Sequence, residues 1–138
     1  MYIYTYLKIS LIIEQVLQRR SAKSTLFNDK TAGDCVYSFG DYDGDFWLGS
    51  AAVLDMTASK PFVLRFELTY RTGTKYFEYG GFSLYMEKTK YRTKYRIRLG
   101  VYHGGNLFGD YFVLRVYIVV ISKRTLMALC LVLVLMIN

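Results

Sequence analysis

The sequence predicts an α+β domain built on an antiparallel β-sheet with short helices. Apolar side chains occupy every second position of Phe62–Tyr70, and a period of two is typical of a strand with one buried face. Residues 50–58 have a short apolar face formed by Val53, Leu54 and Met56, and Ser50 is suited to cap a helix there. A short helix followed by a series of strands favours an antiparallel sheet covered by that helix.

The remaining elements follow from turn residues. The segment Arg71–Thr74 predicts a hairpin turn, with a return strand over residues 75–79. We expect the glycine pair at 80–81 to interrupt this strand, so that residues 82–86 form a separate one. The last predicted strand covers residues 91–99 and ends at Gly100.

Composition limits the classes of protein to which the chain can belong. Its 138 residues suffice for one domain with one core, and 53% hydrophobic and 17% aromatic residues exclude disorder as the overall state. The net charge of +7 predicts attraction to polyanions such as anionic glycans, nucleic acid or acidic lipid, without choosing among them. Two cysteines are too few for a disulfide scaffold, and a single histidine argues against a zinc site.

The two ends differ from the middle of the chain. Residues 1–15 form an atypical apolar segment without the basic start and the cleavage site of a signal peptide. Residues 111–138 form a hydrophobic tail of two apolar runs separated by Lys123 and Arg124. Each run is shorter than the ~20 residues needed to cross a bilayer, and joining them would place charges inside the span. A membrane-embedded tail therefore stays open as an alternative.

The run Phe39–Gly49 has the pattern F-G-x-x-x-G-[DE]-F-W-L-G. Gln18-Arg19-Arg20 precedes it, and Leu99-Gly100-Val101-Tyr102 follows later. In this order the motifs resemble the fibrinogen C-terminal (fibrinogen-related) domain over residues 16–110. The resemblance implies a structural core signature whose members are Phe39, Phe46, Trp47, Leu48 and Gly49. It also implies that Cys35 replaces a core aromatic residue rather than forming a family disulfide.

The resemblance also implies a function class. Fibrinogen-related domains are extracellular, non-enzymatic modules that bind glycan or protein ligands. Their calcium loop and ligand pocket lie in a later part that has no counterpart after Asp110. We therefore expect an incomplete domain at 16–110 between the two unusual ends, with no cofactor.

Three local features invite a catalytic or metal-binding interpretation. Asp41, Asp43 and Asp45 lack the spacing of an EF-hand, and we interpret them as a structural turn. Trp47 has apolar neighbours on both sides and is expected in the core. His103 lies in a glycine-rich loop with no recognisable nucleophile motif, so we expect no enzyme and no metal site.

Basic residues alternate near the end of the predicted domain. They are Lys88, Lys90, Arg92, Lys94, Arg96 and Arg98. On one continuous strand all six would share a face, about 6.6 Å apart, and could bind a polyanion such as a sulfated glycan. A solvated outer face that discourages edge pairing is the simpler interpretation, and a turn near Lys90 would split the row.

Three functional hypotheses follow. The first is a fibrinogen-like recognition module with glycan or protein ligands, able to bind polyanions but with no specific nucleic acid partner. The second is a small membrane-attached protein, with its tail embedded and the basic strand near anionic lipid. The third is a gene fragment without independent function.

Overall fold

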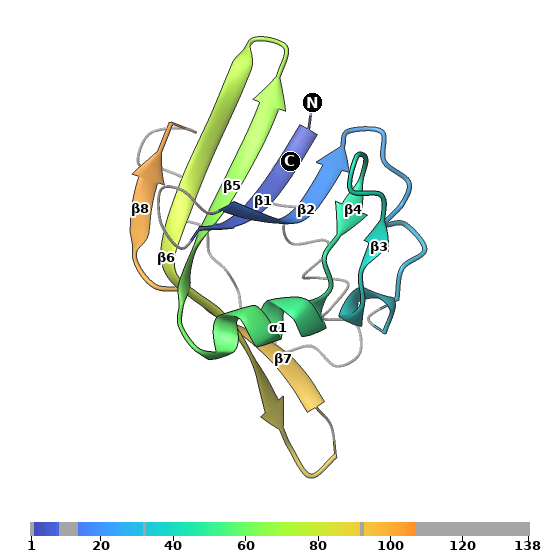
Figure 1. Ribbon diagram of the computed structural model, residues 1–138, viewed down its shortest axis with the longest axis vertical. Coiled ribbons are helices and arrows are strands. Elements are labelled where there is room, and N and C mark those ends of the chain that lie inside the picture. Colours follow the sequence, from blue (N-terminus) through green and yellow to red (C-terminus); the bar gives the residue numbers. More distant parts are fainter. Residues whose placement is uncertain (1, 9–13, 32, 92, 107–138) are drawn as a thin grey trace.

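The computed structural model describes residues 2–8, 14–31, 33–91 and 93–106. Its central feature is one eight-stranded antiparallel sheet, which dominates the fold (Figure 1). The strands follow the order β3-β4-β2-β1-β5-β6-β7, and β8 pairs separately with β6. Their bounds are β1 Tyr2–Lys8, β2 Glu14–Ser21, β3 Phe39–Gly40, β4 Phe46–Trp47, β5 Phe62–Tyr70, β6 Gly73–Lys88, β7 Thr93–Arg98 and β8 Tyr102–Gly105.

The predicted hairpin is present as β5 and β6. Along β5 buried residues alternate with partly exposed ones, as the period of two requires. Phe66 and Phe77 face each other across the pair and stack with ring centroids 4.6 Å apart. The alternation in sequence therefore predicted both the strand and the side that enters the core.

The apolar segment at the start of the chain contributes a strand to this sheet. β1 lies between β2 and β5 and pairs with both of them over its whole length. The sheet thus continues into the segment 1–15, which the sequence suggested was distinct from the domain. Residues 111–138 lie outside the described part of the chain.

β6 runs through the glycine pair at 80–81 as a single strand of 16 residues, so the expected interruption was wrong. Gly81 has a φ of 64°, which bends the strand, and the register against β5 shifts between Phe62 and Leu64. A residue with this φ produces a bulge, and the pairing resumes beyond it. The first part of β6 pairs with β5 and β8, and its last part, from Ser83, pairs with β7.

Helix α1 spans Ser50–Ala58, as predicted, and lies just above β7 in Figure 1. Val53 is buried in the core, and the partly buried Leu54 and Met56 pack against the core cluster. Thr57 links the helix to the sheet, because its hydroxyl accepts a hydrogen bond of 3.0 Å from the Leu84 N–H. The expected cap was wrong: Gly49 precedes the helix, no side chain caps it, and the Ser50 hydroxyl is buried against another segment.

Asp45 ties the acidic turn to the end of β2. Its carboxylate accepts hydrogen bonds from the Ser21 N–H at 2.8 Å and from the Ser21 hydroxyl at 2.9 Å. Burial alone would raise the pKa of Asp45, but hydrogen bonds from neighbouring serines and the nearby Arg19 outweigh it and lower the pKa. The ionised carboxylate therefore stabilises the fold, and this contribution disappears as the pH falls through the lowered pKa.

Replacing Asp45 with asparagine keeps the shape of the side chain and removes its charge. We expect the free energy of unfolding to fall by about 1 kcal/mol at pH 7, and the difference from the parent chain to be lost as the pH falls through the lowered pKa of Asp45. Urea unfolding followed by circular dichroism, at pH 7 and over a series of acidic pH values, measures this. A difference that does not change with pH would contradict the assigned role of the charge.

Candidate functional site

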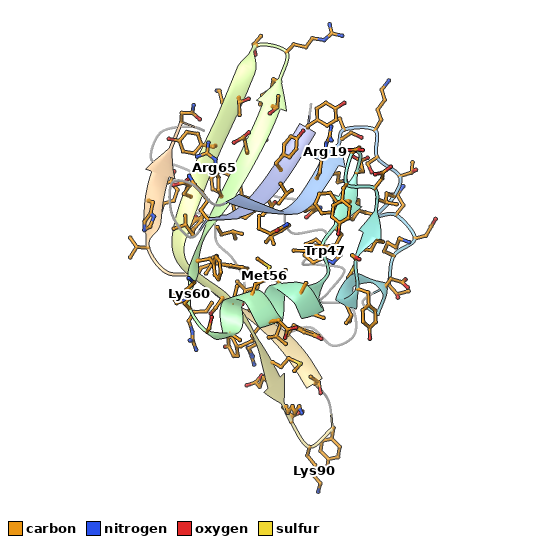
Figure 2. All side chains as sticks on the ribbon, viewed as in Figure 1. Arg19, Trp47, Met56, Lys60, Arg65 and Lys90 are labelled. Atoms are coloured by element: carbon orange, nitrogen blue, oxygen red, sulfur yellow. The ribbon has the colours of Figure 1, made fainter. Side chains whose placement is uncertain are left out.

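The tryptophan of the signature run lies in the core. Trp47 is 1% exposed, and Figure 2 shows it on the inner side of the sheet with Met56 of α1 nearby. Its indole N–H donates a hydrogen bond of 2.7 Å to the carbonyl oxygen of Cys35 in the 3-10 helix η1, Asp34–Val36. The Ser50 hydroxyl donates to the same oxygen at 2.9 Å. The Cys35 carbonyl group therefore connects η1, β4 and the first turn of α1. We call this arrangement of Cys35, Trp47 and Ser50 the tryptophan joint.

The rest of the signature surrounds this joint. Phe46 is buried, and Phe39 and Leu48 are partly buried. Leu48 donates its N–H to the carbonyl oxygen of Leu17 in β2 at 2.8 Å. Gly49 is buried with a φ of 101°, a left-handed conformation that favours glycine. These residues build the fold, and in the described part of the chain Trp47 presents almost no surface to a ligand.

The acidic run forms the turn between β3 and β4. Asp41 accepts a hydrogen bond from the Asp43 N–H on its carboxylate and another from the Gly44 N–H on its carbonyl oxygen. Within the described ranges, no group of three or more histidine, cysteine, aspartate or glutamate side chains could hold a metal ion. The turn interpretation therefore accounts for the contacts of these aspartates.

The basic residues lie on a two-stranded ribbon, formed by Ser83–Lys88 of β6 and by β7, rather than on one continuous strand. Lys88 ends β6, and Lys90 lies in the turn before β7 begins at Thr93. The ribbon extends away from the body of the domain, with Lys90 at its tip (Figures 1 and 2). The six cations therefore do not form a single row, because the turn near Lys90, which the sequence left open as an alternative, divides them. Arg92 lies outside the described residues.

The register of the ribbon separates its two faces. Arg96 lies opposite Tyr85 and Arg98 opposite Ser83, whereas Lys88 lies opposite Thr93. Directly paired residues project to the same side, so Lys88 projects to the other face from the two arginines. The backbone of Lys94 pairs with Glu87, which places this residue in the row of Arg96 and Arg98.

Two side chains of β6 orient these arginines. The Arg96 guanidinium forms an ion pair with Glu87, with Nε donating to Oε2 at 2.6 Å. The Arg98 guanidinium lies over the Tyr85 ring, 5.1 Å from its centroid. Both arginines therefore lie on one face, as their alternation along β7 predicts, but their partners on β6 depend on the register of the ribbon.

A family comparison agrees with the signature. The model of the family described as fibrinogen beta and gamma chains, C-terminal globular domain, matches residues 13–124. The chain belongs to this family. No curated protein matches the chain. The match includes the tryptophan joint and the whole basic ribbon, and it extends past Asp110, where the resemblance in the motifs ended.

Membership in the fibrinogen C-terminal family gives the general class of activity. Domains of this family are binding modules, typically extracellular, and are generally not enzymes. Among the residues that the structure describes, no helix is long and apolar enough to cross a membrane. The hydrophobic tail, on which the membrane hypothesis depends, is not among them.

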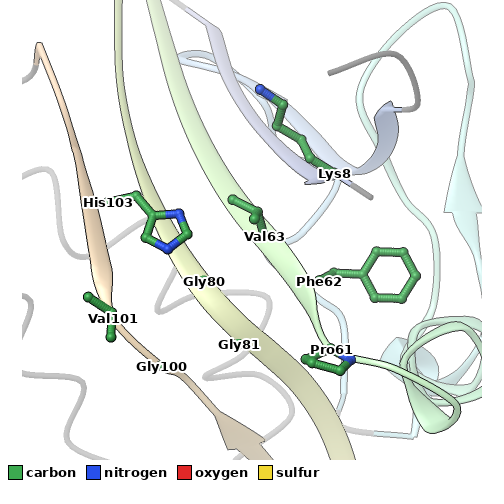
Figure 3. A pocket seen from close by; sticks show the side chains of 9 residues that line it. All are labelled: Lys8, Pro61, Phe62, Val63, Gly80, Gly81, Gly100, Val101 and His103. Atoms are coloured by element: carbon green, nitrogen blue, oxygen red, sulfur yellow. The ribbon is translucent and has the colours of Figure 1, made fainter. Parts of the chain in front are cut away.

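The domain also has an open hollow beside the bend in β6 (Figure 3). Its volume is about 360 Å³, within the range of small-ligand pockets. It lies on the face of β5 that carries Val63, between Lys8 of β1 and His103 of β8. Its one signal in the sequence is the set of glycines at 80, 81 and 100, which by themselves predict only breaks or ends of strands.

Proposed function

We propose that this fibrinogen C-terminal domain is a non-enzymatic extracellular recognition module that binds a sulfated, linear glycan through the basic ribbon. The observation that carries the proposal is the concentration of charge on the ribbon. Residues 83–98 contain six cationic residues and one carboxylate, Glu87, so they hold a net charge of +5 in a chain whose net charge is +7.

The geometry suits a ligand with repeated negative charges. Lys88, Lys90 and Arg98 are exposed, and Tyr91 at the turn is 84% exposed. A projecting ribbon lets a linear polyanion contact the tip and the arginine face together. Arginine forms two parallel hydrogen bonds with sulfate-like groups, and the stacking on Tyr85 limits the motion that Arg98 would lose on binding.

Replacing Lys94, Arg96 and Arg98 with serine tests this proposal. We expect the triple variant to leave a heparin column at markedly lower salt. The slope of log binding constant against log salt should decrease by about 1 for each cation removed from the contact. Binding isotherms at several salt concentrations measure the slope.

A matched variant separates the ribbon from the overall charge. Lys23, Lys60 and Lys75 are exposed and lie outside the ribbon, and changing them to serine removes the same net charge. We expect this variant to change the salt slope little. Equal losses in the two triple variants would contradict a ribbon site and would leave only a net-charge effect.

A change of opposite sign provides a second control. Glu87 neutralises part of the arginine face through Arg96. Glu87→Gln should therefore strengthen heparin binding, by about threefold to tenfold at low salt. Weaker binding by this variant would show that the Glu87–Arg96 pair forms the site rather than competes with the ligand.

A further inference from the structure

We propose that Tyr91, at the tip of the basic ribbon, packs against the apolar face of a sugar ring and so selects a glycan among polyanions. This inference rests on the function proposed above. The charge of the ribbon attracts any polyanion, whereas an aromatic ring adds a contact that only some polyanions can make. Tyr91 is 84% exposed, more than any other large hydrophobic side chain in the described part of the chain.

The ribbon holds Tyr91 where a ligand can reach it. β6 ends at Lys88 and β7 begins at Thr93, so Tyr91 lies in the turn that connects them. Its neighbour Lys90 is at the tip of the ribbon, away from the body of the domain (Figure 2). Thr89 and Lys90 are exposed as well. A ligand that binds the cations of the tip therefore comes within reach of the tyrosine ring.

A cation accompanies this ring. Nζ of Lys90 lies 5.5 Å from the centroid of the Tyr91 ring. The same combination occurs on the arginine face, where the Arg98 guanidinium lies 5.1 Å from the centroid of the exposed Tyr85 ring. A single exposed aromatic side chain is common on protein surfaces. Two ring–cation pairs on one short ribbon, in contrast, repeat a pattern in which an apolar surface lies next to a positive charge.

A sulfated glycan has the matching chemistry. Each pyranose ring presents several C–H groups on one face, and their partial positive charge is attracted to the negative face of an aromatic ring. The sulfate groups project from the edge of the same sugar ring, where an ammonium or a guanidinium can bind them. An inorganic polyphosphate or a ring-free polymer carries the charge without the apolar face. The chemistry of the tip therefore favours a sugar chain.

Replacing Tyr91 with alanine tests the contact with the sugar ring. We expect the affinity of the full-length chain for a heparin oligosaccharide to fall about fivefold to tenfold. Because no cation is lost, the slope of log binding constant against log salt should stay that of the parent chain, and only the binding constant should fall. Isothermal titration calorimetry at several salt concentrations measures both quantities. Tyr91→Phe retains the ring and should bind as the parent chain does.

Poly(vinyl sulfate) separates the ring contact from the charge. This polymer carries sulfate esters on an aliphatic chain and has no sugar ring, so Tyr91→Ala should bind it as tightly as the parent chain does. Tyr37→Ala is the matched control, because Tyr37 is 73% exposed and lies outside the ribbon. We expect this control variant to bind both polyanions like the parent chain. Since the Tyr91 side chain is exposed, Tyr91→Ala should retain the circular dichroism spectrum of the parent chain.

Unchanged heparin affinity in Tyr91→Ala would overturn the inference, and so would an equal loss of affinity for heparin and poly(vinyl sulfate). Tighter binding of a single-stranded oligothymidylate than of a heparin oligosaccharide with the same charge would also overturn it, because the ring would then be assigned to a nucleic acid base. Failure of the proposed function gives a different result, since the two triple variants described above would then lose equal affinity. A loss in the ribbon triple variant alone, with unchanged heparin affinity in Tyr91→Ala, would overturn only the role of the ring.

Discussion

Replacing Trp47 with alanine is expected to lower the free energy of unfolding by about 3–5 kcal/mol. The side chain is 1% exposed, and its removal leaves a large cavity between the sheet and α1. The change also removes the indole N–H that donates to the Cys35 carbonyl oxygen. Since a domain of this size is stable by about 5–15 kcal/mol, much of its stability depends on this residue. Urea unfolding followed by circular dichroism measures the loss, because the variant has no tryptophan to fluoresce.

Trp47→Phe separates the cavity from the hydrogen bond. Phenylalanine fills part of the space but cannot donate, while the Ser50 hydroxyl still satisfies the Cys35 carbonyl oxygen. We expect a loss of about 1–2 kcal/mol, well below that of the alanine variant. A Trp47→Ala chain that unfolds cooperatively within 1 kcal/mol of the parent would show that the tryptophan does not support the core.

Gly49→Ala is expected to have the second-largest effect, a loss of about 3 kcal/mol. Gly49 has a φ of 101°, and an added Cβ would lie 2.8 Å from the carbonyl carbon of Tyr37 and 2.9 Å from the carbonyl oxygen of Val36. These atoms belong to backbone that Trp47 and Ser50 hold against α1, so they cannot move without disturbing the joint. Thermal and urea unfolding of the purified variant test the prediction.

Gly73→Ala separates conformational strain from collision. Gly73 also has a positive φ, 137°, but nothing lies within 4 Å of the added Cβ. We expect a loss of about 1–2 kcal/mol from strain alone, clearly smaller than at Gly49. If the two variants lose the same stability, the close packing at Gly49 contributes nothing to the loss. Glycine would then be required at position 49 only because its φ is positive.

Local pattern predicted several elements well. The alternation in Phe62–Tyr70 gave β5 with its inner face, and residues 50–58 gave α1 with the bounds that the structure has. These patterns depend on residues only a few positions apart in the chain, so they can be recognised without knowing the fold. The tryptophan was expected in the core because of its apolar neighbours, and the structure places it there.

The arrangement of the candidate site could not be predicted from local sequence patterns. The alternation of basic residues was visible in the sequence, but the turn that places Lys88 and Arg96 on opposite faces depends on where β6 meets β7. The contacts of Arg96 with Glu87 and of Arg98 with Tyr85 depend on the same register. The hollow likewise required three glycines, a histidine and a lysine from different strands to meet.

By itself, the sequence determined the class of the domain, its family signature, the β5–β6 hairpin, α1 and the excess of positive charge. Only the tertiary structure decided that the first apolar segment forms a central strand, that β6 continues through Gly81, and which cations share a face. The physical reason is the range of the interactions. Periodicity and turn chemistry act between neighbours in the chain, whereas strand order, register and the closure of a pocket result from contacts between residues that are distant in sequence.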